Sequence, residues 1–471
     1  MLFNSVPFLF FFIAVTLLYF ILPHKYRWIL LLTASCYFYM FFKPEYILIL
    51  AFTIVIDYYA GILLEDEQDD RKRWIYLVMS LCANIGVLAV FKYYNFINDN
   101  ITGLATLFGA KNPIPPLKWL LPIGLSFHTF QAMSYTIEVY WGNQKAERNF
   151  GIYSLYVMFY PQLVAGPIER PQNILHQFYE KHEFNYDDAV QGSNLIAYGL
   201  FKKIVIADRL SEYVNHVYKD IPNANSASAM IACYFFAFQI YCDFSGYSDI
   251  ARGTAKFMGF DLMVNFNRPF MSESISEFWK RWHISLSAWF YDYLFNPLVA
   301  TLRSWRKWAI VFGLLLTFFL SGLWHGASWN YVLWGLLYGI ALVYEFFTKD
   351  FRRKIFGYLP VWANKTLSRL FVFHYFVLAS VFFRATSIPQ AMSMFRKLLE
   401  FKFRVNLNQL SAEMGPVNLL MSFGVIGLLF LSYLLPANLK LKRNFVFLAV
   451  TTFIIIILGK NAVSEFIYFQ F

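Results

Sequence analysis

Long apolar runs separated by short polar stretches dominate this chain. A transmembrane helix needs roughly 20 mostly apolar residues, and the pattern predicts a span at each run that approaches this length. The predicted spans are 6–22, 28–43, 46–64, 75–91, 119–140, 308–324, 330–347, 367–384, 416–436 and 444–460.

The stretch from 150 to 300 is less regular. Its apolar runs, near 151–168, 189–207 and 228–246, are interrupted by proline, glycine and charged residues. Irregular backbone survives in lipid only where protein shields it. We therefore expect shorter, tilted or re-entrant helices packed inside the bundle here, and about ten to thirteen spans in total.

Composition places the whole chain in the membrane. Hydrophobic residues make up 58% of the 471 positions, aromatic residues 21% and charged residues only 15%, whereas soluble domains carry about 25% charged residues. We predict an all-α polytopic membrane protein surrounded by membrane lipids. The chain has no low-complexity linker and no internal repeat, so we expect a single domain, 1–471.

Positive charge predicts the orientation. The net charge is +11, but the basic residues form short clusters between apolar runs, which is typical of membrane loops and argues against nucleic acid as a partner. An outside N-terminus places the clusters near 25–27, 71–73, 303–307 and 349–354 in the cytoplasm. The basic segment 385–415 then falls outside, where we interpret it as an amphipathic surface helix.

Several kinds of chemistry lack their sequence signals. The four cysteines (Cys36, Cys82, Cys233 and Cys242) include no CxxC pair, which argues against a disulfide framework or a zinc site. Walker, GxGxxG and GxSxG motifs and metal-ligand spacings are also absent. We expect neither a metal nor a bound cofactor.

Two of the eight histidines stand out by context. His325 lies in SGLWHGASW, among small residues that allow close backbone approach, and His283 lies in FWKRWHISLSAWF after a cationic pair. Ionisable side chains at membrane depth are candidates for function. For His325 a catalytic and a structural role are equally open, while the context of His283 favours a hydrogen-bonded structural role.

A neutral imidazole suits acyl transfer to an alcohol. It can remove the hydroxyl proton as the C–O bond forms, an effect worth about two to four orders of magnitude in rate. The oxyanion also needs donors, for which Trp324, Ser321, Ser328 and Asn330 are all candidates. Asp243, in YCDFSGYSDI, is expected to cap a helix or to satisfy buried donors.

Five ordered blocks of sequence resemble the membrane-bound O-acyltransferase (MBOAT) superfamily, and within it the alginate O-acetylation protein group. They include YCDFSGYSDIARGTAKFMGFDLMVNFNRPF, SISEFWKRWHISLSAWFYDYLFNPL and LSGLWHGASWNYVLWGLLYG. The blocks occupy 122–142, 158–171, 241–270, 274–298 and 320–339.

The resemblance implies a fold and a site. The expected fold is a ring of helices around a thinned centre, with a tunnel joining the two faces. His325 matches the central histidine taken as the catalytic base, and His283 matches a second position on the cytoplasmic side, so that the two point towards different faces. The residues themselves, and not the resemblance, suggest the expected substrate-binding set: Trp324, Ser321, Asn330, Arg281 and Asp243.

The resemblance also implies a reaction. Acetyl-CoA would donate acetyl from the cytoplasmic side of the bacterial inner membrane, and the acceptor hydroxyl would arrive from outside. An SGNH-type partner protein would complete transfer to a polysaccharide of the alginate, cellulose or peptidoglycan type. Arg281 and Lys280 are candidates to attract the donor's phosphates, although anchoring by positive-inside charge explains them equally well.

Other classes of function stay open. The sister group transfers D-alanine to teichoic acid, but the runs PQLVAGPIERP and DYLFNPL favour the acetylating group. A transporter of acyl donor or glycan is a second alternative, although such folds commonly carry inverted repeats. A structural scaffold for polysaccharide export is a third.

Overall fold

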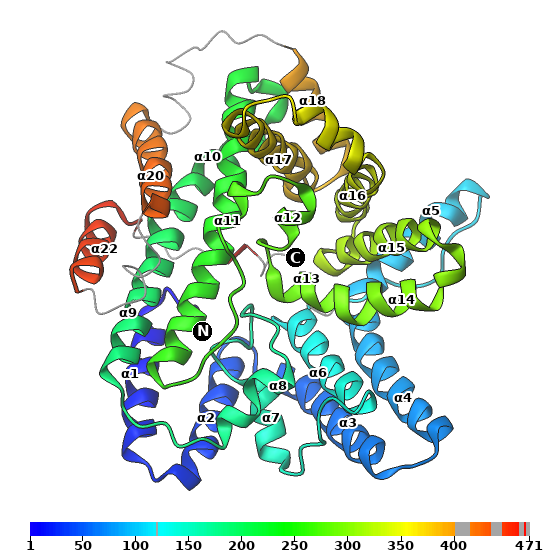
Figure 1. Cartoon of the computed structure of the whole chain (residues 1–471), viewed down its shortest axis with the longest axis vertical. Coiled ribbons are helices and arrows are strands. Elements are labelled where there is room, and N and C mark those ends of the chain that lie inside the picture. The colour runs from blue at the N-terminus through cyan, green and yellow to red at the C-terminus, as the bar shows by residue number, and fades with distance from the viewer. Residues whose placement is uncertain (119–120, 401–414, 435–444, 461–465, 468–471) are drawn as a thin grey trace. The chain divides into compact units, whose positions relative to one another are not determined.

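The computed structural model describes residues 1–118, 121–400, 415–434, 445–460 and 466–467. All regular structure in these ranges is helical (Figure 1), which confirms the all-α prediction. The parts of the predicted spans at 119–120, 435–436 and 444, and of the predicted surface helix at 401–414, lie outside the described residues.

Each predicted span corresponds to a helix. Their bounds are α1 (Val6–Ile21), α2 (His24–Met40), α3 (Ile47–Asp66), α4 (Asp70–Leu88), α6 (Leu125–Tyr140), α15 (Lys307–His325), α16 (Trp329–Phe356), α17 (Val361–Arg384), α20 (Pro416–Leu434) and α22 (Phe445–Leu458).

Seven helical segments of the described chain are long and apolar enough to cross a membrane, and α1 and α22 are shorter apolar helices. The protein is therefore a multi-pass membrane protein. The ten to thirteen spans expected from the sequence are more than these seven, because that estimate also counted helices shorter than 18 residues, such as α1 and α22.

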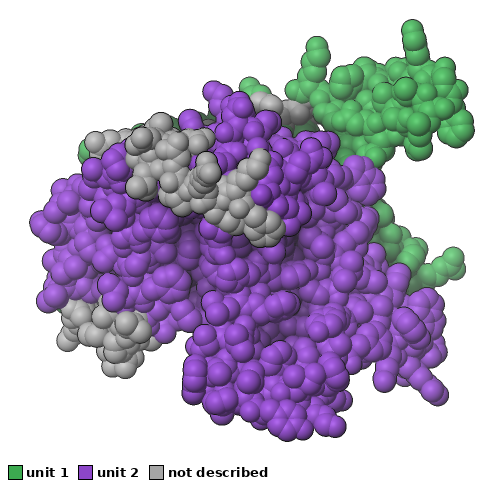
Figure 2. Space-filling model, turned by 90° about the horizontal axis from the view of Figure 1, so that it is seen from above, with its two compact units in different colours: residues 1–192, 254–263 green, residues 193–253, 264–471 purple. Residues whose placement is uncertain are grey.

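The chain forms two compact units (Figure 2). One contains residues 1–192 and 254–263, and the other contains 193–253 and 264–471. The chain passes between them inside α9 (Tyr186–Leu200), inside α11 (Ser226–Phe257) and after Met263. Because each unit combines separate stretches of sequence, no linker marks the division.

The first unit packs α3, α4 and α6 around a buried polar cluster. The Asp57 carboxylate accepts hydrogen bonds from Ser80 Oγ at 2.6 Å and from Asn84 Nδ2 at 2.9 Å. After α7 (Phe150–Met158) the chain leaves the helical conformation but stays buried as far as Glu169. This confirms the expectation of shielded, irregular backbone in this region.

The second unit corrects the prediction for 228–246. That run was expected to be interrupted, yet it lies inside the continuous 32-residue helix α11. Its acids meet two lysines of the preceding π-helical turn η4 (Phe201–Ala207): Asp243 pairs with Lys203 and Asp249 pairs with Lys202. Partners from a neighbouring helix therefore satisfy the polar residues that suggested a break.

Glycine also lets α9 and α11 approach closely. A Cβ atom on Gly246 would lie 2.7 Å from the carbonyl oxygen of Gly199, and a Cβ on Gly199 would lie 2.5 Å from that of Gly246. Small residues of this kind are typical of helix contacts in membranes. Here glycine marks a helix crossing, where the sequence alone suggested an interruption.

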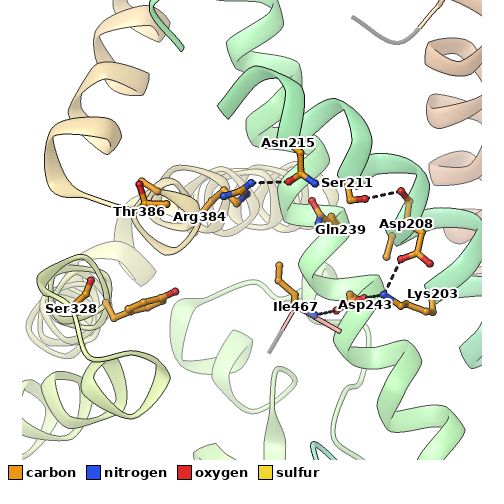
Figure 3. A pocket seen from close by; sticks show the side chains of 13 residues that line it. Lys203, Asp208, Ser211, Asn215, Gln239, Asp243, Ser328, Arg384, Thr386 and Ile467 are labelled. Atoms are coloured by element: carbon orange, nitrogen blue, oxygen red, sulfur yellow. Dashed lines mark hydrogen bonds and ion pairs between the residues drawn. The ribbon is translucent and has the colours of Figure 1, made fainter. Parts of the chain in front are cut away.

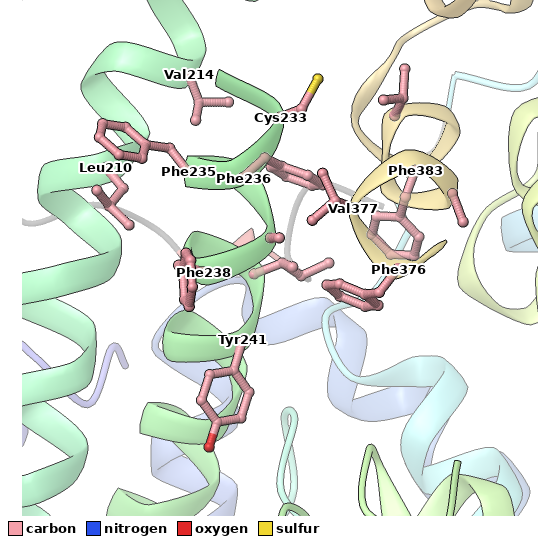
Figure 4. Packing of buried hydrophobic residues seen from close by; sticks show 14 of the residues in the cluster. Leu210, Val214, Cys233, Phe235, Phe236, Phe238, Tyr241, Phe376, Val377 and Phe383 are labelled. Atoms are coloured by element: carbon pink, nitrogen blue, oxygen red, sulfur yellow. The ribbon is translucent and has the colours of Figure 1, made fainter. Parts of the chain in front are cut away.

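Aromatic rings fill the core of the second unit. Figure 4 shows side chains of α10 (Asp208–Lys219), α11 and α17 gathered in one cluster, with Phe236, Phe376 and Phe383 among its buried members. Fully burying a phenylalanine side chain stabilises a fold by about 1.5–3 kcal/mol in water. In lipid, close packing supplies more of the association energy than exclusion of water does.

The remaining elements are short. α18 confirms the helix expected within 385–415 over its described part. The bounds are η1 (Pro44–Tyr46), η2 (Ala89–Tyr93), α5 (Tyr94–Leu107), α8 (Pro171–Ile174), η3 (His176–Phe178), η5 (Ile221–Asn223), η6 (Pro269–Met271), α12 (Ile275–Trp279), α13 (Ile284–Phe290), η7 (Tyr291–Phe295), α14 (Asn296–Thr301), η8 (Arg303–Trp305) and α18 (Ile388–Leu399).

Candidate active site

His283 and His325 lie side by side in the second unit. Their ring centroids are 6.4 Å apart, and His283 is 0% and His325 3% exposed. The Trp324 ring contacts both, at 5.0 Å from His325 and 5.9 Å from His283. The two histidines, expected to point towards different faces, thus belong to one buried cluster.

The end of α15 places His325. The helix stops because Gly326 is extended, and Ser328 then caps α16 by accepting a hydrogen bond from the Asn330 N–H at 3.2 Å. A Cβ atom on Gly326 would collide with the Tyr331 ring. The small residue beside the histidine therefore lets the α15–α16 turn close tightly over the ring of Tyr331.

Aromatic rings surround the His325 imidazole. Trp334 lies 4.9 Å and Phe383 5.4 Å from it, both edge-on. Edge-to-face contacts of this kind are worth about 0.5–1.5 kcal/mol beyond the area they bury. They come from α16 and α17, so three helices hold the ring.

His283 starts α13 in a strained conformation. Its φ is 45° and its ψ is 54°, the left-handed region that residues other than glycine rarely adopt. Such strain of about 1–3 kcal/mol gathers at functional sites. The residue lies at a sharp turn that aims the ring at Phe244, 4.6 Å away, and at Trp324.

Asn265 fixes the tautomer of His283. Its Oδ1 lies 3.2 Å from His283 Nδ1 and also accepts the N–H (3.1 Å) and the hydroxyl (2.9 Å) of Ser285. Because this oxygen only accepts, Nδ1 carries the proton and Nε2 carries the lone pair. Burial lowers the pKa of His283 to about 3, so the ring is neutral at ordinary pH.

Ser321 lines an apolar cavity of about 530 Å³. It lies one helical turn before His325 and is buried. Trp279 and Phe318 form part of the same wall, and Lys280 supplies an exposed ammonium group. This cavity has the size and the mostly apolar lining of a small-molecule site.

Two residues of the predicted substrate-binding set make intramolecular contacts. The Arg281 guanidinium pairs with Glu277 at 2.8 Å, so its charge is already compensated. The Asn330 amide nitrogen donates to the Ala385 carbonyl at 2.7 Å and ties the start of α16 to the end of α17.

Asp243 lines a second, polar cavity of about 360 Å³ (Figure 3). Lys203 Nζ lies 2.7 Å from Asp243 and 2.8 Å from Asp208, and the other Asp243 oxygen accepts the Ile467 N–H at 2.7 Å. The prediction that Asp243 satisfies buried donors is confirmed. Arg384, on the facing wall, donates to Asn215 at 2.7 Å.

The two cavities flank the turn that carries His325. Ser321 precedes the histidine on one wall, Ser328 and Tyr331 follow it on the other, and the cavities share no lining residue. Neither has His283 or His325 in its wall. A continuous tunnel through the histidine pair therefore stays a prediction.

Sequence reasoning missed Lys203, Asn265 and Arg384. The signal for Lys203 was a lysine pair inside an apolar run, LFKKIVIADRL, and Arg384 likewise ends an apolar helix. Asn265 carried no signal of its own. In the described ranges, no three histidine, cysteine, aspartate or glutamate side chains are grouped so that they could hold a metal ion.

The fold and the site define a multi-pass membrane protein with a buried histidine pair at a helix end. Residues 148–388 match the model of the MBOAT, membrane-bound O-acyltransferase family. This stretch holds both histidines and the other predicted site residues. The chain belongs to the membrane-bound O-acyltransferase family, and it is an O-acyltransferase.

Relatives with named activities extend the comparison. The chain is 35% identical over 452 residues to the "Probable alginate O-acetylase AlgI" of Pseudomonas aeruginosa, which covers 94% of this chain and 82% of the relative. It is 32% identical to the peptidoglycan O-acetyltransferase of Helicobacter pylori, over 88% and 82%. It is 29% identical to the teichoic acid D-alanyltransferase of Bacillus subtilis, over 56% and 68%.

Proposed function

We propose that this O-acyltransferase moves an acetyl group from cytoplasmic acetyl-CoA to a hydroxyl group on the extracytoplasmic side of the bacterial inner membrane, for O-acetylation of a cell-surface polysaccharide. The observation that carries the proposal is the position of His325 at the turn between an apolar and a polar cavity. One cavity suits an acyl donor and the other a hydroxylated acceptor.

The reaction needs one base. His325 takes the proton of the acceptor hydroxyl while the hydroxyl oxygen attacks the thioester carbonyl carbon. The C–S bond then breaks, the thiolate leaves, and the imidazolium returns its proton to that sulfur. An ester and a free thiol result, and His325 is again neutral.

The apolar cavity supports binding of the donor. Its walls suit an acyl group and a thioester arm, and the Lys280 ammonium can attract the donor's phosphates. Arg281 was an equal candidate in the sequence, but its charge is engaged by Glu277. Lys280 is therefore the better candidate for contact with phosphate.

The named relatives support acetyl as the acyl group. Two of them, an alginate and a peptidoglycan O-acetyltransferase, align over 94% and 88% of this chain, whereas the D-alanyltransferase aligns over 56%. A polysaccharide of the alginate, cellulose or peptidoglycan type is then the final acceptor. An SGNH-type protein outside the membrane would take part in the last transfer.

Replacement of His325 tests the proposal. Acetate released by mild alkali from envelope polymers should fall to background in H325A and H325Q, while the protein stays folded in the membrane. The matched control is H374Q, because His374 is an exposed histidine on α17 that donates only within its own helix. If H325A released as much acetate from its envelope polymers as the wild type does, His325 would not be the catalytic base.

A second experiment separates the alternatives. Purified wild-type protein in vesicles receives acetyl-CoA labelled in its acetyl group, together with an oligosaccharide acceptor. Transfer produces a labelled ester and free CoA, whereas a transporter would deliver intact donor. Labelled D-alanyl carrier protein in place of acetyl-CoA identifies the D-alanyl alternative.

A further inference from the structure

The polar cavity has facing walls of different charge. On one wall Lys203 is held between Asp208 and Asp243, so its ammonium is compensated by two carboxylates. Arg384, the last residue of α17, lies on the facing wall (Figure 3). Within the described ranges no carboxylate lies at ion-pair distance from Arg384.

Neighbouring side chains hold Arg384 in place. One guanidinium nitrogen donates to Asn215 Oδ1 at 2.7 Å, and the guanidinium lies 4.9 Å from the centre of the Tyr218 ring. Both partners belong to α10, whereas Arg384 belongs to α17. A guanidinium held in this way still has N–H groups that can donate to an anion. A carboxylate can accept two parallel hydrogen bonds from them.

A buried amide on α11, one helical turn before Asp243, also points to a ligand. Gln239 is only 8% exposed, and its Oε1 has no hydrogen-bond partner among the residues that the structure describes. An unsatisfied buried amide oxygen costs about 1–3 kcal/mol, so a donor from a ligand would stabilise it. The amide group can both donate to and accept from the hydroxyl groups of a sugar.

The cavity lies next to the catalytic histidine. Tyr331 forms part of its wall, the Tyr331 ring lies 5.0 Å from Phe383, and Phe383 lies 5.4 Å from His325. Two aromatic rings, those of Tyr331 and Phe383, thus lead from the cavity to the base. A hydroxyl group bound in the cavity would reach His325 only after these two rings move aside.

We propose that this cavity is the acceptor site and that it selects an acidic sugar, with Arg384 binding the carboxylate and Gln239 a hydroxyl group. The inference rests on the proposed function, because it assigns the acceptor of the same reaction. The cavity volume of about 360 Å³ lies at the small end of the range for small-molecule sites. It therefore suits one end of a glycan.

A carboxylate fits better than a phosphate. Asp208 and Asp243 lie on the wall that faces Arg384, and they would repel a doubly charged phosphate monoester more than a singly charged carboxylate. The single uncompensated guanidinium matches one negative charge. The phosphodiesters of a glycerol phosphate polymer carry one charge each, so the experiment below includes such a polymer to test carboxylate against phosphate at equal charge per group.

Binding to the purified full-length protein in detergent tests the proposal without acetyl transfer. The probes are a uronic acid trisaccharide, a neutral glucose trisaccharide and a glycerol phosphate trimer. The wild-type protein should bind the uronate at least tenfold more tightly than the other two. A hydrogen bond to a charged group corresponds to roughly 10- to 100-fold in Kd, and R384Q should lose that much affinity for the uronate.

Control variants separate charge from packing. R369Q removes another α17 arginine, which pairs with Glu273 away from the cavity, and should bind as the wild type does. Q239L should weaken the uronate and the neutral sugar equally. If R384Q does not fold, R384K, which keeps the charge without the fork, should still bind the uronate more weakly than the wild type.

Several results would overturn the acceptor site. These are equal affinity of the wild type for acidic and neutral sugars, preference for glycerol phosphate, and unchanged uronate affinity in R384Q. H325A should bind the uronate as tightly as the wild type, because binding needs no base. Failure of the proposed reaction would appear differently, as uronate binding by a wild-type protein that forms no acetyl ester.

Discussion

The Trp324 ring packs against both His283 and His325, whose ring centroids lie 6.4 Å apart. The tryptophan is the residue directly before the proposed base, and it is 3% exposed. Positioning of reacting groups is sensitive, since a displacement of about 1 Å can cost about 100-fold in rate. The distance between the two imidazoles should therefore depend on this indole.

Truncation of Trp324 tests that dependence. We expect W324A to lose about 3–5 kcal/mol of stability and about 100-fold in acetyl transfer by the protein that remains folded. W324F keeps an aromatic ring and should lose less of both. W308A is the control, because Trp308 is 66% exposed. Acetyl transfer at the wild-type rate by folded W324A would contradict this role.

Because of its backbone conformation, position 283 should be more stable with glycine than with alanine, the reverse of the usual order in helices. At a φ of 45°, alanine pays the left-handed penalty of about 1–2 kcal/mol and glycine does not. H283G should therefore unfold at a higher denaturant concentration than H283A. His128 lies in the ordinary helix α6, so H128G should be less stable than H128A by about 1 kcal/mol. The same order at both positions would contradict the strain at His283.

Stability should also depend on pH through His283. Burial lowers its pKa in the folded protein to about 3, from 6.5 in an exposed chain. The unfolded state therefore binds a proton first as the pH falls, and stability present above pH 6.5 is lost below it. Between pH 6.5 and 5 this loss amounts to about 2 kcal/mol. Denaturant titrations in detergent should show a smaller loss in H283A, and equal losses would contradict the buried neutral ring.

The sequence predicted the helices more completely than the geometry of the candidate site. Apolar runs predicted every long helix except α11, because span length is a local property of the chain. The continuous length of α11 was not predicted, because Lys202 and Lys203, which satisfy Asp249 and Asp243, lie on a preceding helix. A pairing of that kind leaves no local signal.

The site was predicted through its residues rather than its geometry. The local sequence singled out both His325 and His283, and the resemblance then suggested a role for each. Their contact depends on how the end of α15 meets the start of α13, which no local pattern contains. For the same reason Asn265, which holds His283 by a hydrogen bond, could not be recognised beforehand.

The stability of the protein should depend on the ion pairs of the buried Lys203 with Asp208 and Asp243. Lys203 and both partners are less than 8% exposed in their side chains. K203M leaves two buried carboxylates without their cation and should cost about 3–5 kcal/mol. The triple variant K203M/D208N/D243N removes all three charges and should recover much of that loss. Denaturant unfolding in detergent measures both, and equal stability of K203M and the wild type would contradict the role of the ion pairs.

Close packing of α15 against α16 should be needed to hold His325 in place. A Cβ atom on Gly335 would collide with the Phe318 carbonyl oxygen on α15, and a rigid backbone atom cannot move aside as a side-chain end can. We expect G335A to lose more than about 2 kcal/mol of stability, as overpacked cores do, and to lose acetyl transfer as α15 shifts. A Cβ atom on Gly424, on α20, would meet no other described residue within 4 Å, so G424A should be neutral or stabilising, because alanine favours a helix by about 1 kcal/mol. If G335A matched G424A in both stability and activity, the α15–α16 contact would not be what positions the base.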